Sequence, residues 1–319
     1  MAIVAATNEN IDRAATLLRT GGVVAFPTET VYGLGANAFD VAAVARIFEI
    51  KGRPAFDPLI VHVAGDAMLR RVAAEIGPRA VALIDRFWPG PLTLVLPKRA
   101  EVPDLVTAGL PTVGVRMPAH PVARALLERS GMPLAAPSAN PFGRLSPTRA
   151  AHVERGLGDG PDLILDGGPS PVGLESTIVA VDLRPALLRR GAIAAEDLEA
   201  VVGPLERPPE DPANAPLSPG RLPQHYAPRT PIRILDFEPV PSAERAEAGA
   251  LAFRAAPAGY AAVRVLSAAG DLREAAGRFF ECLHELDLAG VTRIDAEPLP
   301  ERGLGAAMME RLRRATFSA

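Results

Sequence analysis

A proline-rich stretch after residue 200 divides this chain of 319 residues into two parts. Prolines recur between Gly203 and Pro231. They prevent a regular helix or strand there, because proline fixes φ and has no backbone N–H to donate. The chain is also long enough for more than one domain. We therefore expect a larger domain over residues 1–205, a linker over residues 206–230 and a smaller domain over residues 231–319.

Short apolar runs alternate with amphipathic stretches along both parts. Residues 23–26, 59–63, 92–96 and 112–116 have the length and composition of buried strands, whereas residues 274–288 carry a helical stripe. Some connections between strands are too short for the crossover helix that a parallel pair requires. The first part therefore predicts a mixed α/β sheet, and the second part predicts a smaller α/β domain.

Polar residues stand where two of the helices are expected to begin. Asn8 or Asn10 precedes the first apolar stripe, and Asp40 precedes the second. The side-chain oxygen of such a residue accepts a hydrogen bond from a backbone amide of the first helical turn. We therefore predict N-caps at Asn8 or Asn10 and at Asp40.

The composition argues against several classes of protein. The net charge is −3 and aromatic residues make up 5%, so neither the overall field nor stacking surfaces favour nucleic acid. Cys282 is the one cysteine, which excludes an internal disulfide and a zinc site built on cysteine pairs. No apolar run approaches the length of a membrane span, and no basic leader precedes an apolar run. We expect a cytoplasmic protein with no membrane partner.

Polar residues gather directly after the predicted strands. Residues 27–35, Pro-Thr-Glu-Thr-Val-Tyr-Gly-Leu-Gly, follow the first of these strands, which Pro27 ends. Open α/β sheets bind their ligands at strand ends, and guanidinium groups bind phosphate and carboxylate in pairs of hydrogen bonds. Each cation taken alone could also be a solvated surface charge. Several cations at the ends of strands in one sheet together predict an anionic ligand. The polar residues at the predicted strand ends are Lys51, Arg53, His62, Thr112, Arg116, Ser138, Asn140, Ser146, Glu175, Ser176, Thr177 and Arg190.

Several kinds of catalytic machinery do not occur in the sequence. It contains no Gly-x-Gly-x-x-Gly fingerprint, no phosphate-binding Gly-Lys-Ser/Thr loop and no Gly-x-Ser-x-Gly elbow. Cys282 lies in an amphipathic stretch and is interpreted as a small core residue. Ser138 has no neighbouring base, which favours hydrogen bonding over covalent catalysis.

Several short motifs follow one another in a fixed order along the chain. They are Pro27–Gly35, Lys51-x-Arg53-Pro54, Pro58-Leu59 with His62, Trp88–Thr93, Thr112–Pro118, Ala136–Asn140, Glu175–Ile178, Ser218-Pro219-Gly220 and His225-Tyr226-Ala227-Pro228. Their order resembles that of the YrdC family over essentially the first 200 residues, which implies a twisted mixed sheet with helices and a large concave cleft. The linker and the second part resemble the two-domain form of the family, with a smaller Rossmann-like α/β domain.

The resemblance implies an L-threonylcarbamoyladenylate synthase activity. Such a nucleotidyltransferase joins L-threonine, bicarbonate or CO2, and ATP, and releases pyrophosphate. Its product serves the threonylcarbamoyl modification of the adenosine beside the anticodon in tRNA. The implied partners are these substrates and the proteins that transfer the group to tRNA, while direct tRNA binding stays open. Mg2+ is expected to arrive with ATP, and no tightly bound organic cofactor is expected.

The resemblance also assigns roles to individual residues. L-Threonine would contact Thr30, His62, Arg116, Ala136 and Ser176. The catalytic tetrad would be Lys51, Arg53, Ser138 and Asn140. ATP would contact Arg53, Asp57, Thr112, Ser138, Ser146, Arg190 and Tyr226, with Tyr226 reaching back from a linker that closes over the site. Asp57 departs from the family pattern, which has Asn there.

Two alternatives and one unassigned residue stay open. The chain could be an RNA-binding module, although its charge and few aromatics argue against this. It could also be a carbamoyl-adenylating enzyme with another amine or carbamoyl donor. Glu29 is a candidate general base, but the sequence does not fix its distance from a substrate amine.

Overall fold

The computed structural model describes residues 3–181, 184–208, 218–219, 225–238 and 240–316. Its residues group into two compact units, which we describe one at a time. The first unit consists of Met1–Phe142, Pro147–Ser170 and Glu175–Leu222. The second consists of Gly143–Ser146, Pro171–Leu174 and Pro223–Ala319. Residues 209–217 and 220–224 of the predicted linker lie outside the described residues.

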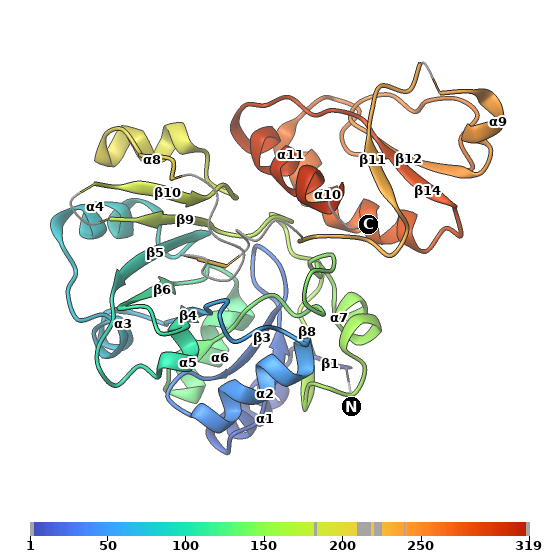
Figure 1. Cartoon of the computed structure of the whole chain (residues 1–319). Coiled ribbons are helices and arrows are strands. Elements are labelled where there is room, and N and C mark those ends of the chain that lie inside the picture. Colours follow the sequence, from blue (N-terminus) through green and yellow to red (C-terminus); the bar gives the residue numbers. More distant parts are fainter. Residues whose placement is uncertain (1–2, 182–183, 209–217, 220–224, 239, 317–319) are drawn as a thin grey trace. The chain divides into compact units, whose positions relative to one another are not determined.

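The first unit contains a ten-stranded mixed sheet with the order β1-β8-β2-β3-β7-β4-β6-β5-β9-β10 (Figure 1). Strand β2 pairs antiparallel with β3, whereas β4 pairs parallel with β6. The predicted mixed sheet is therefore confirmed. The strands are β1 Ile3–Ala5, β2 Val24–Phe26, β3 Gly33–Asn37, β4 Ile60–His62, β5 Leu92–Pro97, β6 Thr112–Arg116, β7 Leu134–Ala135, β8 Leu163–Asp166, β9 Thr177–Ala180 and β10 Ala186–Arg189.

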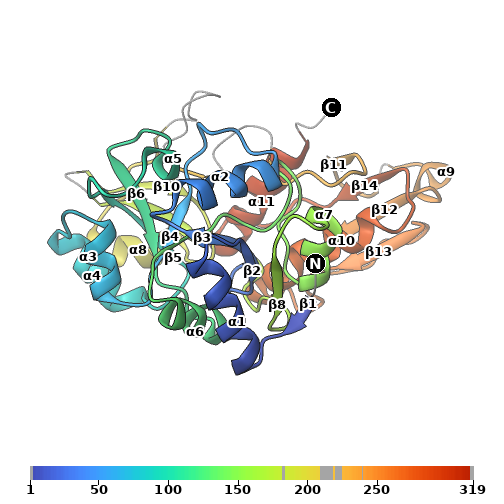
Figure 2. The same ribbon diagram turned by 90° about the horizontal axis from the view of Figure 1, so that it is seen from below.

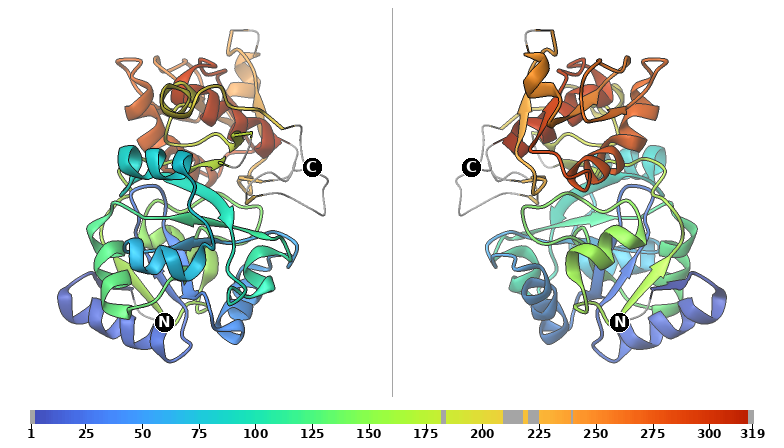
Figure 3. Two further views of the ribbon diagram at one scale, coloured as in Figure 1. Left: turned by 90° about the vertical axis from the view of Figure 1, so that its left-hand side faces the viewer. Right: turned by 90° about the vertical axis from the view of Figure 1, so that its right-hand side faces the viewer.

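Helices cover both faces of this sheet (Figures 2 and 3). On one face, α1 and α6 pack against each other and against an apolar cluster that includes Val24, Phe26 and Leu134. The main core, on the other face, includes Val44 and Ile47 of α2 and Leu83 of α4. The helices are α1 Asn8–Arg19, α2 Val41–Lys51, α3 Asp66–Val72, α4 Pro78–Phe87, α5 Asp104–Thr107, α6 Pro121–Ser130, α7 Ala150–Leu157 and α8 Ala195–Val202.

The caps of two helices differ in how well the sequence predicts them. Asp40 caps α2 as predicted, accepting hydrogen bonds from the amides of Ala42 and Ala43. The cap of α1 is Thr7, whose hydroxyl accepts from the amide of Asn10, so the prediction of Asn8 or Asn10 is wrong. The cap thus lies one residue before Asn8, and Asn8 is the first residue of the helix.

The strands that carry the candidate site alternate between the two faces of the sheet. Val61 of β4 and Val113 and Val115 of β6 lie in the main core. Their neighbours Ile60 and Arg116 therefore project from the opposite face, because successive side chains of a strand alternate. In β4 and β6, one face thus contributes to the main core, while the other presents the polar groups that the site requires.

The second unit contains a four-stranded sheet with the order β11-β14-β12-β13, in which every pair is parallel. Helix α10 contacts β12 and β13, and α11 contacts β11 and α10 (Figure 1). This arrangement agrees with the predicted Rossmann-like α/β domain. The elements are β11 Ile232–Ile234, α9 Ser242–Arg245, β12 Ala248–Ala252, β13 Ala262–Val265, α10 Leu272–Asp287, β14 Arg293–Ala296 and α11 Gly303–Thr316.

Across the described ranges of both units, we find no helix that combines the length and the apolarity needed to cross a membrane.

Candidate active site

Arg116 is the centre of a buried polar cluster. It ends β6 directly beside His62, which ends the parallel neighbour β4. Its Nη1 donates to Thr30 Oγ1 at 2.8 Å, and its Nη2 lies 2.7 Å from Glu29 Oε1. Its Nε donates to the carbonyl of Gly90 at 3.3 Å. The side chain is therefore held on three sides by the β2–β3 loop and by the segment before β5.

The loop of residues 27–32 is fixed by its own hydrogen bonds. Thr28 Oγ1 lies 2.8 Å from Thr30 Oγ1 and donates to the carbonyl of Val31 at 2.6 Å. Strand β3 then passes so close to Phe26 that a Cβ at Gly35 would lie 2.7 Å from a ring carbon of that residue. Glycine is thus required for the hairpin that presents Thr30 to Arg116.

His62 is neutral over the physiological pH range. Burial, together with the positive charge of Arg116, lowers the pKa of its imidazole to about 3. Its ring meets Phe26 edge-on, with the ring centroids 6.3 Å apart. Ala136, which follows β7, donates its amide to the carbonyl of Ile60 and so lies next to this strand. A neutral imidazole can contact a substrate without adding charge to the pocket.

Ser176 lies at the amino end of β9 and is hydrogen-bonded from two directions. Its hydroxyl is 2.7 Å from that of Thr93 on β5. Arg189 donates to the Ser176 carbonyl at 2.9 Å and to its hydroxyl at 3.1 Å. Arg190, for which the resemblance implies a contact with ATP, is the next residue and is half-buried after β10; that contact stays a prediction. An irregular register between Leu187 and Arg189 turns Arg189 onto Ser176, which an alternating pattern does not reveal.

Lys51 joins two of the predicted catalytic residues through their backbones. It is the last residue of α2, and its Nζ donates to the carbonyls of Ser138, at 2.6 Å, and of Asn140. Burial and the nearby Arg53 hold the pKa of this amine well below its usual value. The structure therefore brings Lys51, Ser138 and Asn140 together.

Arg53 forms an ion pair that is almost completely buried. Its Nη2 lies 2.8 Å from Asp57 Oδ2 and donates to the carbonyl of Pro58 at 2.8 Å, while its Nε donates to the carbonyl of Asp57. Asp57 is 0% exposed. The residue that departs from the family pattern is thus the counter-ion of a predicted catalytic arginine.

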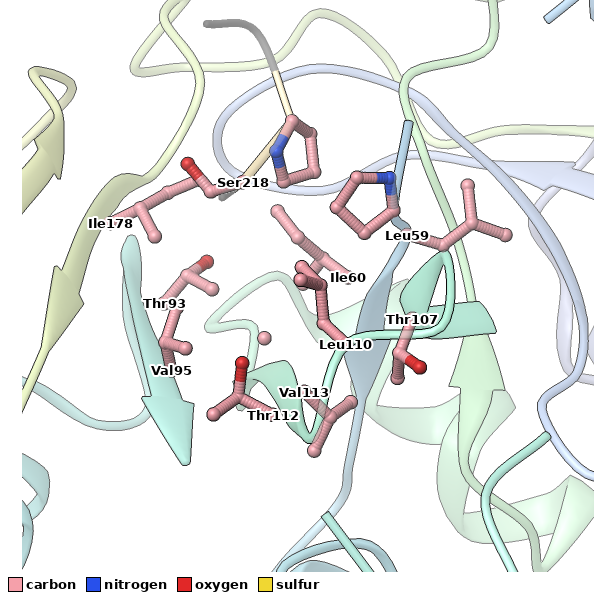
Figure 4. Close-up of a pocket in the computed structure, with 13 residues that line it drawn as sticks. Leu59, Ile60, Thr93, Val95, Thr107, Leu110, Thr112, Val113, Ile178 and Ser218 are labelled. Carbon is pink, nitrogen blue, oxygen red and sulfur yellow. The ribbon is translucent and has the colours of Figure 1, made fainter. Parts of the chain in front are cut away.

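A small cavity lies over the same face of the sheet (Figure 4). Its volume is about 10 Å³, which leaves room for about one water molecule. Thr93, Thr112 and Ile178 of the sheet line it, together with Ser218 and Pro219 of the predicted linker. Arg189 also donates to the carbonyl of Pro219, at 3.2 Å. A short piece of the predicted linker therefore lies directly above the strands that carry the site.

Ser146 and Tyr226 belong to the second unit, and the structure places them among that unit's residues. The carbonyl of Ser146 lies 3.1 Å from His284 Nε2 of α10. The ring of Tyr226 packs on Phe280 at 5.8 Å and lies beneath the guanidinium of Arg311 at 5.3 Å. Their predicted contacts with ATP stay predictions.

Two family models match the chain in succession. The first, described as telomere recombination and covering the Sua5, YciO and YrdC proteins, matches residues 16–191. The second, the C-terminal domain of threonylcarbamoyl-AMP synthase, matches residues 193–316. The first unit therefore has the YrdC-type α/β fold of a nucleotidyltransferase-type enzyme.

Relatives of similar length share both parts of the chain. The threonylcarbamoyl-AMP synthase of Pyrococcus abyssi is 42% identical over 99% of this chain and 98% of its own. The threonylcarbamoyl-AMP synthase of Bacillus subtilis is 43% identical over 97% of this chain and 94% of its own. A crystal structure of P. abyssi Sua5 complexed with L-threonine matches with a TM-score of 0.90 over 97% of this chain and 95% of that chain, at 42% identity. The chain belongs to the two-domain threonylcarbamoyl-AMP synthase family.

Proposed function

We propose that this protein forms L-threonylcarbamoyl-AMP and pyrophosphate from L-threonine, bicarbonate or CO2, and ATP. The observation that carries the proposal is the buried cluster of Arg116, Thr30 and His62, in a chain that matches a threonine-bound relative over almost its whole length. An arginine suits the carboxylate of an amino acid, and the hydroxyl of Thr30 and the neutral imidazole of His62 lie beside it. Ser176, which lies on the same face of the sheet, adds a hydroxyl to this pocket.

The reaction needs positioning and charge stabilisation rather than a covalent enzyme intermediate. The threonine ammonium first releases one proton to water to become a neutral amine; its nitrogen then forms a bond to the carbon of CO2 and releases a second proton to water, which gives a carbamate. A carbamate oxygen then bonds to the α-phosphorus of ATP, and the bond from that phosphorus to the β-bridging oxygen breaks as pyrophosphate leaves. Negative charge develops on the phosphate oxygens, where cationic side chains stabilise it. We assign this role to Arg53 and Lys51, with Ser138 and Asn140 as hydrogen-bonding groups.

We propose Mg2+ as the metal that accompanies ATP. Among the described residues, no group of three or more His, Cys, Asp or Glu side chains could hold a metal ion. Mg2+ commonly keeps several waters and binds substrate phosphates with one or two carboxylates. The ion would shield the charge of the triphosphate as the carbamate approaches. The product would serve tRNA modification in the cytoplasm, passed on by proteins that transfer the threonylcarbamoyl group.

The test is pyrophosphate release by the purified full chain with ATP and Mg2+. Release should require both L-threonine and bicarbonate, and mass spectrometry should detect threonylcarbamoyl-AMP. ATP turnover that is unchanged without threonine would overturn the proposal. Two further assays, one with serine in place of threonine and one with carbamoyl phosphate in place of bicarbonate, distinguish the proposed activity from a related carbamoyl-adenylating activity. Salt-dependent tRNA binding tighter than ATP binding would instead favour an RNA-binding module.

A further inference from the structure

We propose that Glu29 binds the ammonium group of the substrate and makes the pocket selective for α-amino acids over other carboxylates. The proposal rests on the proposed function, since it concerns the site assigned to L-threonine. Its basis is the pair that Glu29 forms with Arg116, at 2.7 Å between Oε1 and Nη2, with both side chains almost fully buried. Neither the family resemblance nor the sequence gives Glu29 this role.

Polar atoms with unused hydrogen-bonding capacity gather around this pair. Within the described residues, Glu29 Oε2 and His62 Nδ1 are buried without a hydrogen-bond partner, beside the Glu29 Oε1 and Arg116 Nη2 atoms that face each other at 2.7 Å. Buried polar atoms are nearly always hydrogen-bonded in folded proteins, because leaving one unpaired costs about 1–3 kcal/mol. Two such atoms beside one buried ion pair indicate that this cluster is built to receive a polar ligand.

The charges of the pocket decide which ligand it accepts. Arg116 contributes one positive charge and Glu29 one negative charge, while His62 is neutral. Burial alone would raise the pKa of Glu29, but the charge of Arg116 and the hydrogen bonds to the carboxylate together lower it, so its carboxyl stays ionised at neutral pH. The cluster of Arg116, Glu29 and His62 therefore carries no net charge of its own.

A ligand with a carboxylate alone would leave this pocket with an uncompensated negative charge. Two carboxylates would then compete for Arg116 in a buried site, where an unpaired charge is costly. An α-amino acid brings a carboxylate and an ammonium together and adds no net charge. Its carboxylate would bind Arg116, and its ammonium would bind the oxygens of Glu29. The same charge argument disfavours an amine that lacks a carboxylate.

The alternative is that Glu29 only holds Arg116 in place. In that case its loss would weaken the binding of every carboxylate ligand equally, because each of them depends on Arg116. If Glu29 instead contacts the ammonium, its loss would weaken the binding of amino acids selectively. The ratio of two affinities thus separates the two roles.

The experiment is calorimetric titration of the full chain with two ligands, without ATP. One ligand is L-threonine, and the other is 2,3-dihydroxybutyrate of matching configuration, in which a hydroxyl replaces the amino group. The unmodified protein should prefer threonine by about 100-fold or more, as sites built around a substrate polar group do. Glu29→Gln should weaken threonine binding by about 10- to 100-fold and reduce the preference to a few-fold. Glu29→Asp, which keeps the charge, should retain most of the preference.

Equal affinity of the unmodified protein for both ligands would overturn the proposal, and this result needs no variant. A Glu29→Gln protein that keeps the full preference would overturn it as well. These outcomes differ from a failure of the proposed function. That failure would appear as an unmodified protein that does not bind threonine or does not release pyrophosphate in response to it.

Discussion

At the scale of single residues, the candidate site is built from two buried ion pairs. Arg53 pairs with Asp57 and Arg116 pairs with Glu29, each at or below 2.8 Å. Such pairs add little net stability, because removing both charges from water offsets their attraction. Losing one partner is costly, because the other charge then stays buried and unpaired. Mutations of the site therefore act on folding as well as on chemistry.

Arg53→Ala illustrates this coupling. The family resemblance predicts that this variant is inactive. The buried ion pair predicts in addition that it destabilises the first unit by about 3–5 kcal/mol, because the charge of Asp57 is left uncompensated. Ser138→Ala should abolish activity with little effect on stability, since Lys51 contacts the backbone carbonyl of Ser138. Urea unfolding followed by Trp88 fluorescence measures the stability, and pyrophosphate release measures the activity.

The double variant Arg53→Ala, Asp57→Asn is the control. It removes both charges, so it should recover part of the lost stability but none of the activity. An unfolding midpoint of Arg53→Ala equal to that of the unmodified protein would show that the pair is not buried as described. Activity of Ser138→Ala within a few-fold of the unmodified enzyme would remove this residue from the site.

His62 makes stability depend on pH. The pKa of its imidazole is about 3 in the folded protein and 6.5 in the unfolded chain. Between these two pH values the unfolded chain therefore binds a proton that the folded chain does not. Stability is therefore lost as the pH falls below 6.5. Between pH 6.5 and about pH 5 the loss is about 1.5 kcal/mol. His62→Gln should remove this part of the pH dependence in urea unfolding, and equal slopes for the two proteins would contradict the assignment.

The sequence identifies most of the polar cluster but not how its members pair. Thr30 follows β2, His62 and Arg116 end β4 and β6, and Ser176 directly precedes β9, so the polar residues gather at strand ends as predicted. The pairing of Glu29 with Arg116 is not visible, because the two residues come from segments that only the sheet brings together. Arg189 is missed for a different reason, since the irregular register of β10 overrides simple alternation.

At the scale of elements, patterns of side chains predict the strands that have strong β-formers. The prediction of Thr112–Arg116 matches β6, and that of residues 92–96 falls within β5. Strand β12 is not predicted, because Ala-Gly-Ala-Leu-Ala contains no β-branched or aromatic residue. It forms because β14 and β13 pair with it on both sides. Tertiary context thus decides the elements whose local signal is weak.

Helix α2 connects a cap to the site. Asp40 begins the helix, and Lys51 ends it with its amine on the Ser138–Asn140 segment. Asp40→Ala should destabilise the first unit by about 1 kcal/mol, because the amides of Ala42 and Ala43 lose their acceptor. Asp40→Asn is the matched control and should stay near the unmodified value, since Asn is an equally good cap. Urea midpoints that are equal for the Ala and Asn variants would contradict this role.

At the scale of the whole molecule, each unit has its own core, and Tyr226 belongs to that of the second. It is 2% exposed and adopts a positive φ of 66°, a conformation that costs most residues stability. Tyr226→Ala should destabilise the second unit by about 3–5 kcal/mol through the cavity left beside Phe280. Hydrogen exchange should quicken for the amides of α10 and α11.

Tyr226→Phe provides the comparison, because it keeps the ring and its packing. Its exchange rates should stay close to those of the unmodified protein. Unchanged exchange in Tyr226→Ala would show that the ring is not part of this core. A loss of activity in Tyr226→Phe without faster exchange would instead support the predicted contact with ATP.

The side chains of β4 alternate between the two faces of the sheet, and this limits where single residues can be inserted or deleted. Val61 packs in the core, while Ile60 and His62 lie on the opposite face. Deleting one residue from this strand would turn every later side chain of the strand to the other face, which would bury polar groups in the core and present apolar ones to the substrate. Insertions and deletions of single residues are therefore tolerated only in the loops between such strands, even where each remaining amino acid is unchanged.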